Sequence, residues 1–205
     1  MGVGSDIFSF YGISKPASSA LESPVYSCLS KKKHYNGLVP EFLYFQETQA
    51  GLFVKAVGHI TASLSVDLKI LVMERLDRLP VPADVYADLS ECSYMDSTFM
   101  GLLVGFHKKL KAMTGRSLSL LNPSNECEKL LRGLGIWRLM RVVEGRLAEG
   151  EPQFWTTVTK NNSPNPEILL TAHQNLSEIS PENAQKFSTL EEILKDQIKP
   201  GSSGN

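Results

Sequence analysis

"VYADLSECSYMDSTFMGLLVGFHKKLKAM", residues 85–113, joins a compact apolar segment directly to an amphipathic one. The run "DVYADLS" at its start predicts a buried strand. The second half predicts a helix, because large apolar residues recur on one helical face: Phe99, Leu102, Leu103, Phe106 and Leu110. Lysines near its C-terminal end suit the helix dipole, and Thr114-Gly115 is typical of a helix end. Met95-Asp96-Ser97-Thr98 therefore forms an acidic, hydroxyl-bearing corner between strand and helix.

Secondary structure on either side of this stretch follows an alternating order. Upstream, "EFLYFQETQAGLFVKAVG" predicts a hairpin of two strands turning at Gln49-Ala50-Gly51, and "SLSVDLKILVMERLDRL" predicts a helix stopped by Pro80 and Pro82. Downstream, "SLSLL" predicts a strand, "NECEKLLRGLG" a short helix and "LMRVV" a last strand. Helices between successive strands require crossover connections. The expected fold is therefore α/β, with a mixed, mostly parallel sheet of about four to five strands covered by helices.

The chain divides into four predicted parts. Residues 1–39, rich in Ser and Gly, predict a loosely ordered leader; residues 40–150 form the α/β domain, and 151–166 a linker. Residues 167–199 predict two C-terminal helices, the second beginning at Ser180-Pro181-Glu182. Each carries one apolar stripe, which must be buried on the domain or on a partner. A homodimer is one way to bury it.

Composition excludes several classes of function. With 42% hydrophobic and 21% charged residues the chain is typical of a globular protein, and 21 Lys and Arg nearly balance 22 Asp and Glu. No net field draws it to nucleic acid, and no run of about 18 apolar residues or export signal is present, so a cytoplasmic protein without membrane or nucleic-acid partners is expected. Three separated cysteines lack metal-site spacing; Cys92 and Cys127 are interpreted as packing residues.

Enzyme chemistry is not predicted. The flanks of Ser97 lack the Gly-x-Ser-x-Gly elbow, and His107 on the same helix is interpreted as a polar-face residue. His59 and His173 are isolated in the sequence and are expected at the surface or as caps. No Walker-type glycine loop exists. We therefore predict no catalytic residue, no cofactor and no metal ligand.

A family resemblance rests on "DLSECSYMDSTFMGLL" followed by "GRSLSLLNPSNECEKLLRGLGI". Over residues 42–145 the chain resembles the STAS domain of bacterial anti-sigma-factor antagonists, in which a strand leads to Asp-Ser-Ser/Thr-Gly-Leu-Gly and a helix. The resemblance implies the STAS fold and a phosphorylation switch. Ser97 would be phosphorylated by a serine kinase that is also an anti-sigma factor; the unphosphorylated protein would bind that kinase, and a metal-dependent serine phosphatase would reset it.

Partner contacts implied by the resemblance surround this serine: Asp96, Thr98, Phe99, His59, Ile60 and Thr61. Phe99 and Met100 stand where the family usually has Gly and Leu, which predicts a bulkier surface beside Ser97. Thr61 stands where many members have an acidic residue.

Two other interpretations of the corner remain open. Asp96 or Ser97 could be only the N-cap of the helix, contributing about 0.5–2 kcal/mol. The chain could also be an adaptor subunit of a lipid-transport or signalling complex in which Ser97 is never modified. The switch is physically coherent, because helix N-termini tolerate an added phosphate whose charge would repel a partner fitted to the neutral corner.

Overall fold

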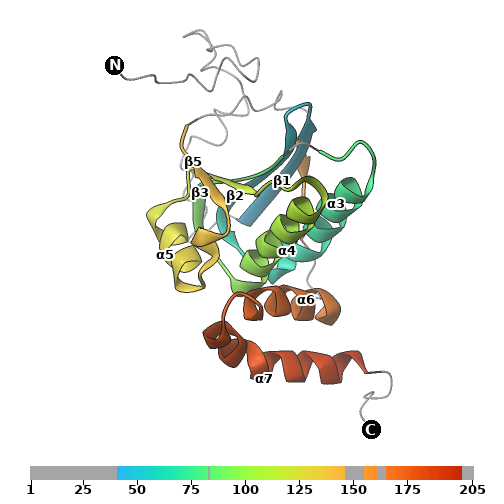
Figure 1. The fold of residues 1–205 in the computed structure, drawn as a ribbon, viewed down its shortest axis with the longest axis vertical. Helices are drawn as coiled ribbons and strands as arrows, with labels where there is room; N and C mark the ends of the chain where they lie inside the picture. The colour runs from blue at the N-terminus through green and yellow to red at the C-terminus, as the bar shows by residue number, and fades with distance from the viewer. Residues whose placement is uncertain (1–40, 83, 146–154, 161–164, 200–205) are drawn as a thin grey trace.

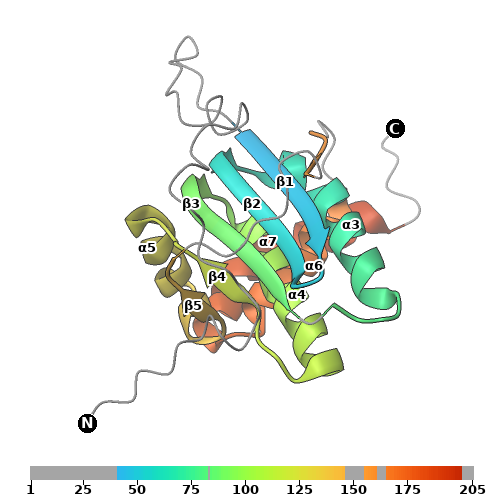
Figure 2. The ribbon, with the colours of Figure 1, turned by 90° about the horizontal axis from the view of Figure 1, so that it is seen from above.

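The computed structural model describes residues 41–82, 84–145, 155–160 and 165–199. Its centre is a six-stranded sheet in the order β5-β4-β3-β2-β1-β6 (Figures 1 and 2). The strands are β1 (Glu41–Thr48), β2 (Gly51–Ile60), β3 (Val85–Met95), β4 (Ser119–Leu121), β5 (Arg141–Val143) and β6 (Thr156–Thr157). β2, β3, β4 and β5 run parallel to one another, whereas β1 pairs antiparallel with both β2 and β6. The mixed α/β sheet predicted from the sequence is confirmed, with β6 as an additional edge strand.

Helices lie in the predicted intervals between the strands and after the last strand. They are α3 (Ser65–Asp77), α4 (Ser97–Thr114), α5 (Asn125–Gly133), α6 (Pro166–Ser177) and α7 (Pro181–Ile198), with short 3-10 turns η1 (Ala62–Leu64) and η2 (Ile136–Arg138). α3 and α4 pack side by side on one face of the sheet (Figure 2). α6 crosses against α4, and α7 lies outside α6, farthest from the sheet (Figure 1). We call α6 and α7 together, residues 166–198, the C-terminal hairpin.

Local signals explain where the helices begin and end. Gly115 closes α4 in the left-handed conformation, with φ of 72°, where a side chain would be strained. Ser124 and Ser180 cap α5 and α7, each accepting a hydrogen bond from a backbone N–H of the first turn. The end of α4 at Thr114-Gly115 and the start of α7 at Ser180-Pro181-Glu182 were predicted from the sequence, and both are confirmed.

The central helix α4 is buried on more than one side. Every residue from 98 to 107 is buried, although the sequence predicted only one apolar face. Phe99 and Phe106 belong to the large core cluster together with strand residues such as Leu89 and Ile60. Since α6 also packs on α4, this helix is enclosed between the sheet and the C-terminal hairpin. Cys92 and Cys127 are buried in the core, as predicted, with Cys127 Sγ donating to the carbonyl oxygen of Cys92 at 3.3 Å.

Candidate functional site at the start of α4

The Asp96 carboxylate connects two segments that lie far apart in the sequence. Its Oδ1 accepts the backbone N–H of Phe99 at 2.9 Å, which makes Asp96 the N-cap of α4. Its Oδ2 accepts the N–H of Ala62 at 2.7 Å, and its own N–H donates to the carbonyl of Ile60 at 3.0 Å. Residues 59–61 and 96–99, both predicted to form the site, therefore lie next to each other, joined by the backbone bond from Asp96 to Ile60 and by the side-chain bond to the adjoining Ala62.

Burial has an electrostatic consequence for this carboxylate. Desolvation raises the pKa of Asp96 above its ordinary value, while hydrogen bonds from the backbone N–H groups of Phe99, Ala62 and Thr98, and the nearby His173, act in the opposite direction. Because the pKa is raised overall, the effect of removing the carboxylate from water is larger than the effect of its hydrogen bonds. A second negative group placed beside Asp96 would therefore meet a poorly solvated charge.

The Ser97 hydroxyl is engaged by a histidine from the C-terminal hairpin. Ser97 Oγ lies 2.9 Å from His173 Nε2, and His173 Nδ1 lies 2.8 Å from the carbonyl oxygen of Leu169. Because a carbonyl only accepts, Nδ1 carries the proton that it donates to Leu169. In the neutral ring Nε2 is then the acceptor, and the Ser97 hydroxyl donates to it.

His173 was expected at the surface or as a cap, and that expectation is wrong. Its side chain is only 3% exposed, and its ring packs against Phe187 with the centroids 5.2 Å apart. The missed signal is its position: His173 lies on the apolar stripe of α6 with Leu169 and Leu176. A histidine on such a stripe is buried and needs a polar partner, which here is Ser97.

A serine and a histidine at this distance have the geometry of a nucleophile and its base. His173 is buried and α6 packs against α4 beside the hydroxyl, whereas Ser97 itself is half-buried. His107, the other histidine weighed for this role, is buried as well and accepts the N–H of Leu118 at 3.3 Å. The interpretation of His107 as a polar-face residue is therefore wrong.

Close packing of α6 against α4 depends on glycine. A Cβ added to Gly101 would lie 2.2 Å from the carbonyl oxygen of Ala172, so the two helix backbones are nearly in contact. Asn175 Nδ2 donates to the carbonyl of Gly101 at 3.2 Å, and Lys108 Nζ donates to Asn175 Oδ1 at 3.1 Å and pairs with Glu178. These contacts hold α6 across the first turns of α4.

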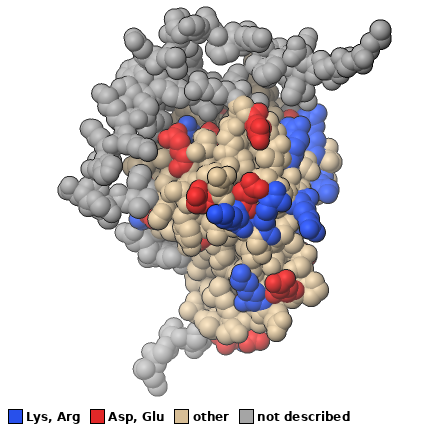
Figure 3. All heavy atoms as spheres, turned by 90° about the vertical axis from the view of Figure 1, so that its left-hand side faces the viewer, with Lys and Arg blue, Asp and Glu red and all other residues tan. Residues whose placement is uncertain are grey.

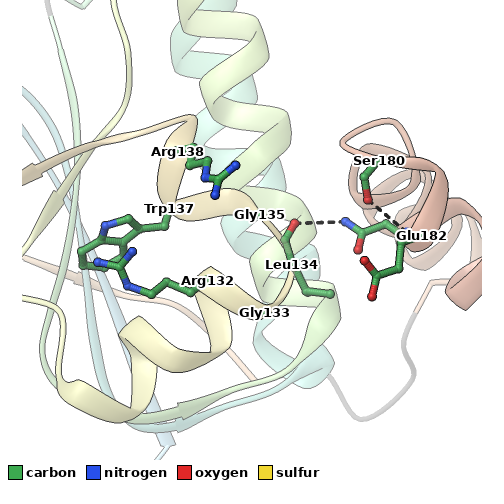
Figure 4. Close-up of a pocket in the computed structure, with 9 residues that line it drawn as sticks. Arg132, Gly133, Leu134, Gly135, Trp137, Arg138, Ser180 and Glu182 are labelled. Carbon is green, nitrogen blue, oxygen red and sulfur yellow. Dashed lines mark hydrogen bonds between the residues drawn. The ribbon is translucent and has the colours of Figure 1, made fainter.

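A second attachment lies where α7 begins (Figure 4). The buried Asn183 donates from Nδ2 to the carbonyl oxygens of Leu134 and Leu176, each at 3.0 Å. Beside it is a cavity of about 410 Å³ between the α5–η2 segment and the start of α7, lined by Arg132, Gly133, Leu134, Gly135, Trp137, Arg138, Ser180, Glu182 and Asn183. The hairpin is therefore hydrogen-bonded to the domain here without being closely packed against it.

The remaining predicted contact residues differ in exposure. Thr98, Phe99 and Ile60 are buried and present no surface to a partner in this structure, whereas His59 and Thr61 are half-buried. Phe99 and Met100 pack into the core, so the predicted bulky surface beside Ser97 is wrong: the bulk at this position comes from α6. His59 contacts the ring of Tyr94, with the centroids 5.4 Å apart.

Metal sites, membrane-spanning helices and charged patches are other features by which a site could be recognised. No group of His, Cys, Asp and Glu in the ranges given above could hold a metal ion. Among the helices that the structure describes, none has the length and apolar character needed to cross a membrane. The face that carries α5 shows acidic and basic side chains next to one another, so no patch of one sign covers it (Figure 3).

The family model described as "STAS domain" matches residues 17–149, and the matched segment includes the strand, the Asp96 corner and α4. The chain belongs to the STAS domain family. The match ends before β6 and the C-terminal hairpin, so the helix that covers Ser97 lies outside the STAS segment.

Similar proteins include the anti-sigma-B factor antagonists of Staphylococcus aureus strains NCTC 8325 / PS 47 and COL. Each is 39% identical over 66 residues, which is 32% of this chain and 60% of the relative. The chain thus spans 60% of the length of the curated relatives that it matches. Among solved structures, the Bacillus cell fate determinant SpoIIAA in its phosphorylated form is similar at 19% identity with a TM-score of 0.43, covering 51% of this chain and 91% of that one. The anti-sigma factor antagonist SpoIIAA in its unphosphorylated form is similar at 19% identity with a TM-score of 0.40, covering 51% of this chain and 88% of that one.

Proposed function

We propose that this STAS protein is a signalling component of the anti-sigma-factor-antagonist type. In its unphosphorylated form it binds an anti-sigma serine kinase in the cytoplasm, and phosphorylation of Ser97 by that kinase ends the binding. A metal-dependent serine phosphatase removes the phosphate. The observation that carries the proposal is the placement of Ser97 as the first residue of α4, directly after the capping Asp96, in a chain of this family.

The geometry of the corner supports a charge-controlled contact. Ser97 lies at a helix N-terminus, where unpaired backbone N–H groups and the helix dipole favour an added anion, so the domain itself tolerates a phosphate. The same phosphate, carrying a charge of about −1.5 to −2, would lie beside the buried carboxylate of Asp96. A partner surface fitted to the neutral corner would then be repelled, while the fold survives.

Mass spectrometry after incubation with ATP tests this function. The native protein is mixed with each purified anti-sigma-type serine kinase of its host, and phosphate is expected on Ser97. Ser97→Ala should abolish the label, whereas Ser93→Ala, an exposed serine on β3, should retain it. Phosphorylation of Ser97 should also weaken binding of the protein to the kinase, measured by titration calorimetry. The same incubation is made with Gly101→Ala, whose added Cβ would push α6 away from α4. Absence of phosphate on Ser97 with every kinase, in the native protein and in this variant, would contradict the proposal and favour the unmodified adaptor.

A further inference from the structure

The C-terminal hairpin occupies the surface on which the proposed function depends. We propose that this hairpin is a displaceable intramolecular cover, which competes with the kinase for Ser97 and the first turns of α4. The inference rests on the proposed function, because a cover regulates the site only if a partner must reach Ser97. Nothing in the STAS segment itself supplies this cover, since the family match ends at residue 149.

The Ser97 hydroxyl must be accessible to ATP before it can be phosphorylated. Phosphorylation forms a bond between Ser97 Oγ and the γ-phosphorus of ATP, breaks the bond from that phosphorus to the β–γ bridging oxygen, and releases ADP while a base takes the hydroxyl proton. In this structure Oγ lies 2.9 Å from His173 Nε2, the ring is 3% exposed, and Ser97 itself is half-buried. The kinase cannot align ATP with Oγ until His173, and with it α6, moves away.

The C-terminal hairpin is attached to the domain by a limited set of contacts. Its buried apolar residues are few: Ile168, Ala172, Leu176, Phe187 and Leu194. Its other attachments are hydrogen bonds and the partly exposed Lys108–Glu178 ion pair. The cavity of about 410 Å³ between α7 and η2 leaves part of this contact unpacked (Figure 4). A contact of this kind separates more readily than the sheet and α4 beneath it.

Separation of α6 from α4 would uncover a surface on α4. Thr98, Gly101 and Gly105 are buried on α4, and the nearest atoms to a Cβ on either glycine come from α6, at Ala172 and Asn175. Removal of α6 exposes this glycine-lined face immediately next to Ser97. One helix face thus serves either α6 or the kinase, and binding of one excludes the other.

The test compares opened, native and locked forms of the full chain. Gly101→Ala opens the contact, because its Cβ meets the Ala172 backbone; Gly133→Ala, where nothing lies within 4 Å, is the matched control. For the lock, Gly105→Cys is combined with Asn175→Cys and Cys28→Ser. A Cβ at Gly105 lies 3.7 Å from Asn175 Cγ, so the side chains at these two positions face each other at close range. Hydrogen exchange of residues 166–177 reports hairpin docking, and initial rates of Ser97 phosphorylation with ATP and the anti-sigma-type kinases of the host report access.

The expected result is faster exchange of residues 166–177 in Gly101→Ala and at least tenfold faster phosphorylation than in the native protein. The oxidised lock should be phosphorylated at least tenfold more slowly than the same molecule after reduction. Phosphorylation of Ser97 at equal rates in the opened, native and locked forms overturns the cover and leaves the proposed function standing. Absence of phosphate on Ser97 in all forms, the opened one included, overturns the proposed function itself.

Discussion

Three glycines of this chain form a graded test of how the hairpin is attached. A Cβ at Gly101 would lie 2.2 Å from the carbonyl oxygen of Ala172, which is backbone and cannot rotate away. A Cβ at Gly105 would lie 2.7 Å from Asn175 Nδ2, the far end of a flexible side chain. A Cβ at Gly133 would have nothing within 4 Å. Alanine at these positions is therefore expected to weaken hairpin docking strongly, slightly and not at all.

The size of the strongest effect follows from what α6 would lose. If α6 shifts just enough to relieve the contact, the Asn175–Gly101 and His173–Ser97 hydrogen bonds are lost at about 1 kcal/mol each, so docking weakens by about 2 kcal/mol. The higher helix propensity of alanine in α4 does not offset this loss, because α4 stays helical whether α6 is docked or not. If α6 separates fully, burial of Ile168 and Leu176 is lost as well, at about 1.5–3 kcal/mol each, and the loss is about 5 kcal/mol or more.

Hydrogen exchange measured residue by residue provides the assay. The free energy of local opening for residues 166–177 should fall by about 2 kcal/mol or more in Gly101→Ala, by less in Gly105→Ala, and should stay the same in Gly133→Ala. Exchange of β2 and β3 serves as the internal reference, because the clash of a Cβ at Gly101 involves only α6. Equal protection of α6 in Gly101→Ala and the native protein would show that close approach at Gly101 does not hold α6 on α4, as would equal losses in Gly101→Ala and Gly133→Ala.

Three further predictions concern the corner and the core beside it. Asp96→Ala removes the helix cap and the bond to Ala62, and should lower the free energy of unfolding by about 1–3 kcal/mol in urea titrations; an unchanged midpoint would contradict the bridging role. Burial and Lys111 lower the pKa of His107 below 6.5, so the unfolded chain binds more protons between the two values; native stability should fall as pH drops through that window, and His107→Gln should lack this dependence. Ser97→Asp should weaken kinase binding at least tenfold while shifting the thermal midpoint by less than about 3 °C, or about 1 kcal/mol for a chain of this size; a large midpoint shift would show that the charge disrupts the fold instead.

Elements with their own periodicity could be predicted from the sequence, and those that depend on distant pairing could not. The strand run "DVYADLS" and the apolar spacing of α4 lie within short windows, so their type and order were predictable. β6 consists of Thr156 and Thr157, which are exposed and form a strand only by pairing with Phe45 and Tyr44 at the edge of β1. Two residues carry no periodicity, so the segment was predicted as part of a linker.

The candidate site shows the same division. Asp96 and Ser97 were identified because the strand, corner and helix are contiguous, and the structure adds that Asp96 also binds Ala62. His173 was missed because 76 residues separate it from Ser97, and a polar residue within an apolar stripe was assigned to the surface. Helical spacing can indicate that a residue such as His173 is buried, but it does not indicate which residue of another element will contact it.

The composition of α4 argues that its outer face requires a covering partner. Two glycines, Gly101 and Gly105, lie one turn apart within the helix, where each lowers helix stability by about 1 kcal/mol relative to alanine. Neither is needed for packing on the sheet, since the atoms nearest to each belong to α6. Their absence of side chains is useful only if another backbone approaches α4 closely at this position. α6 does so here, next to the hydroxyl of Ser97, and any kinase that uses the same corner must replace it on that face.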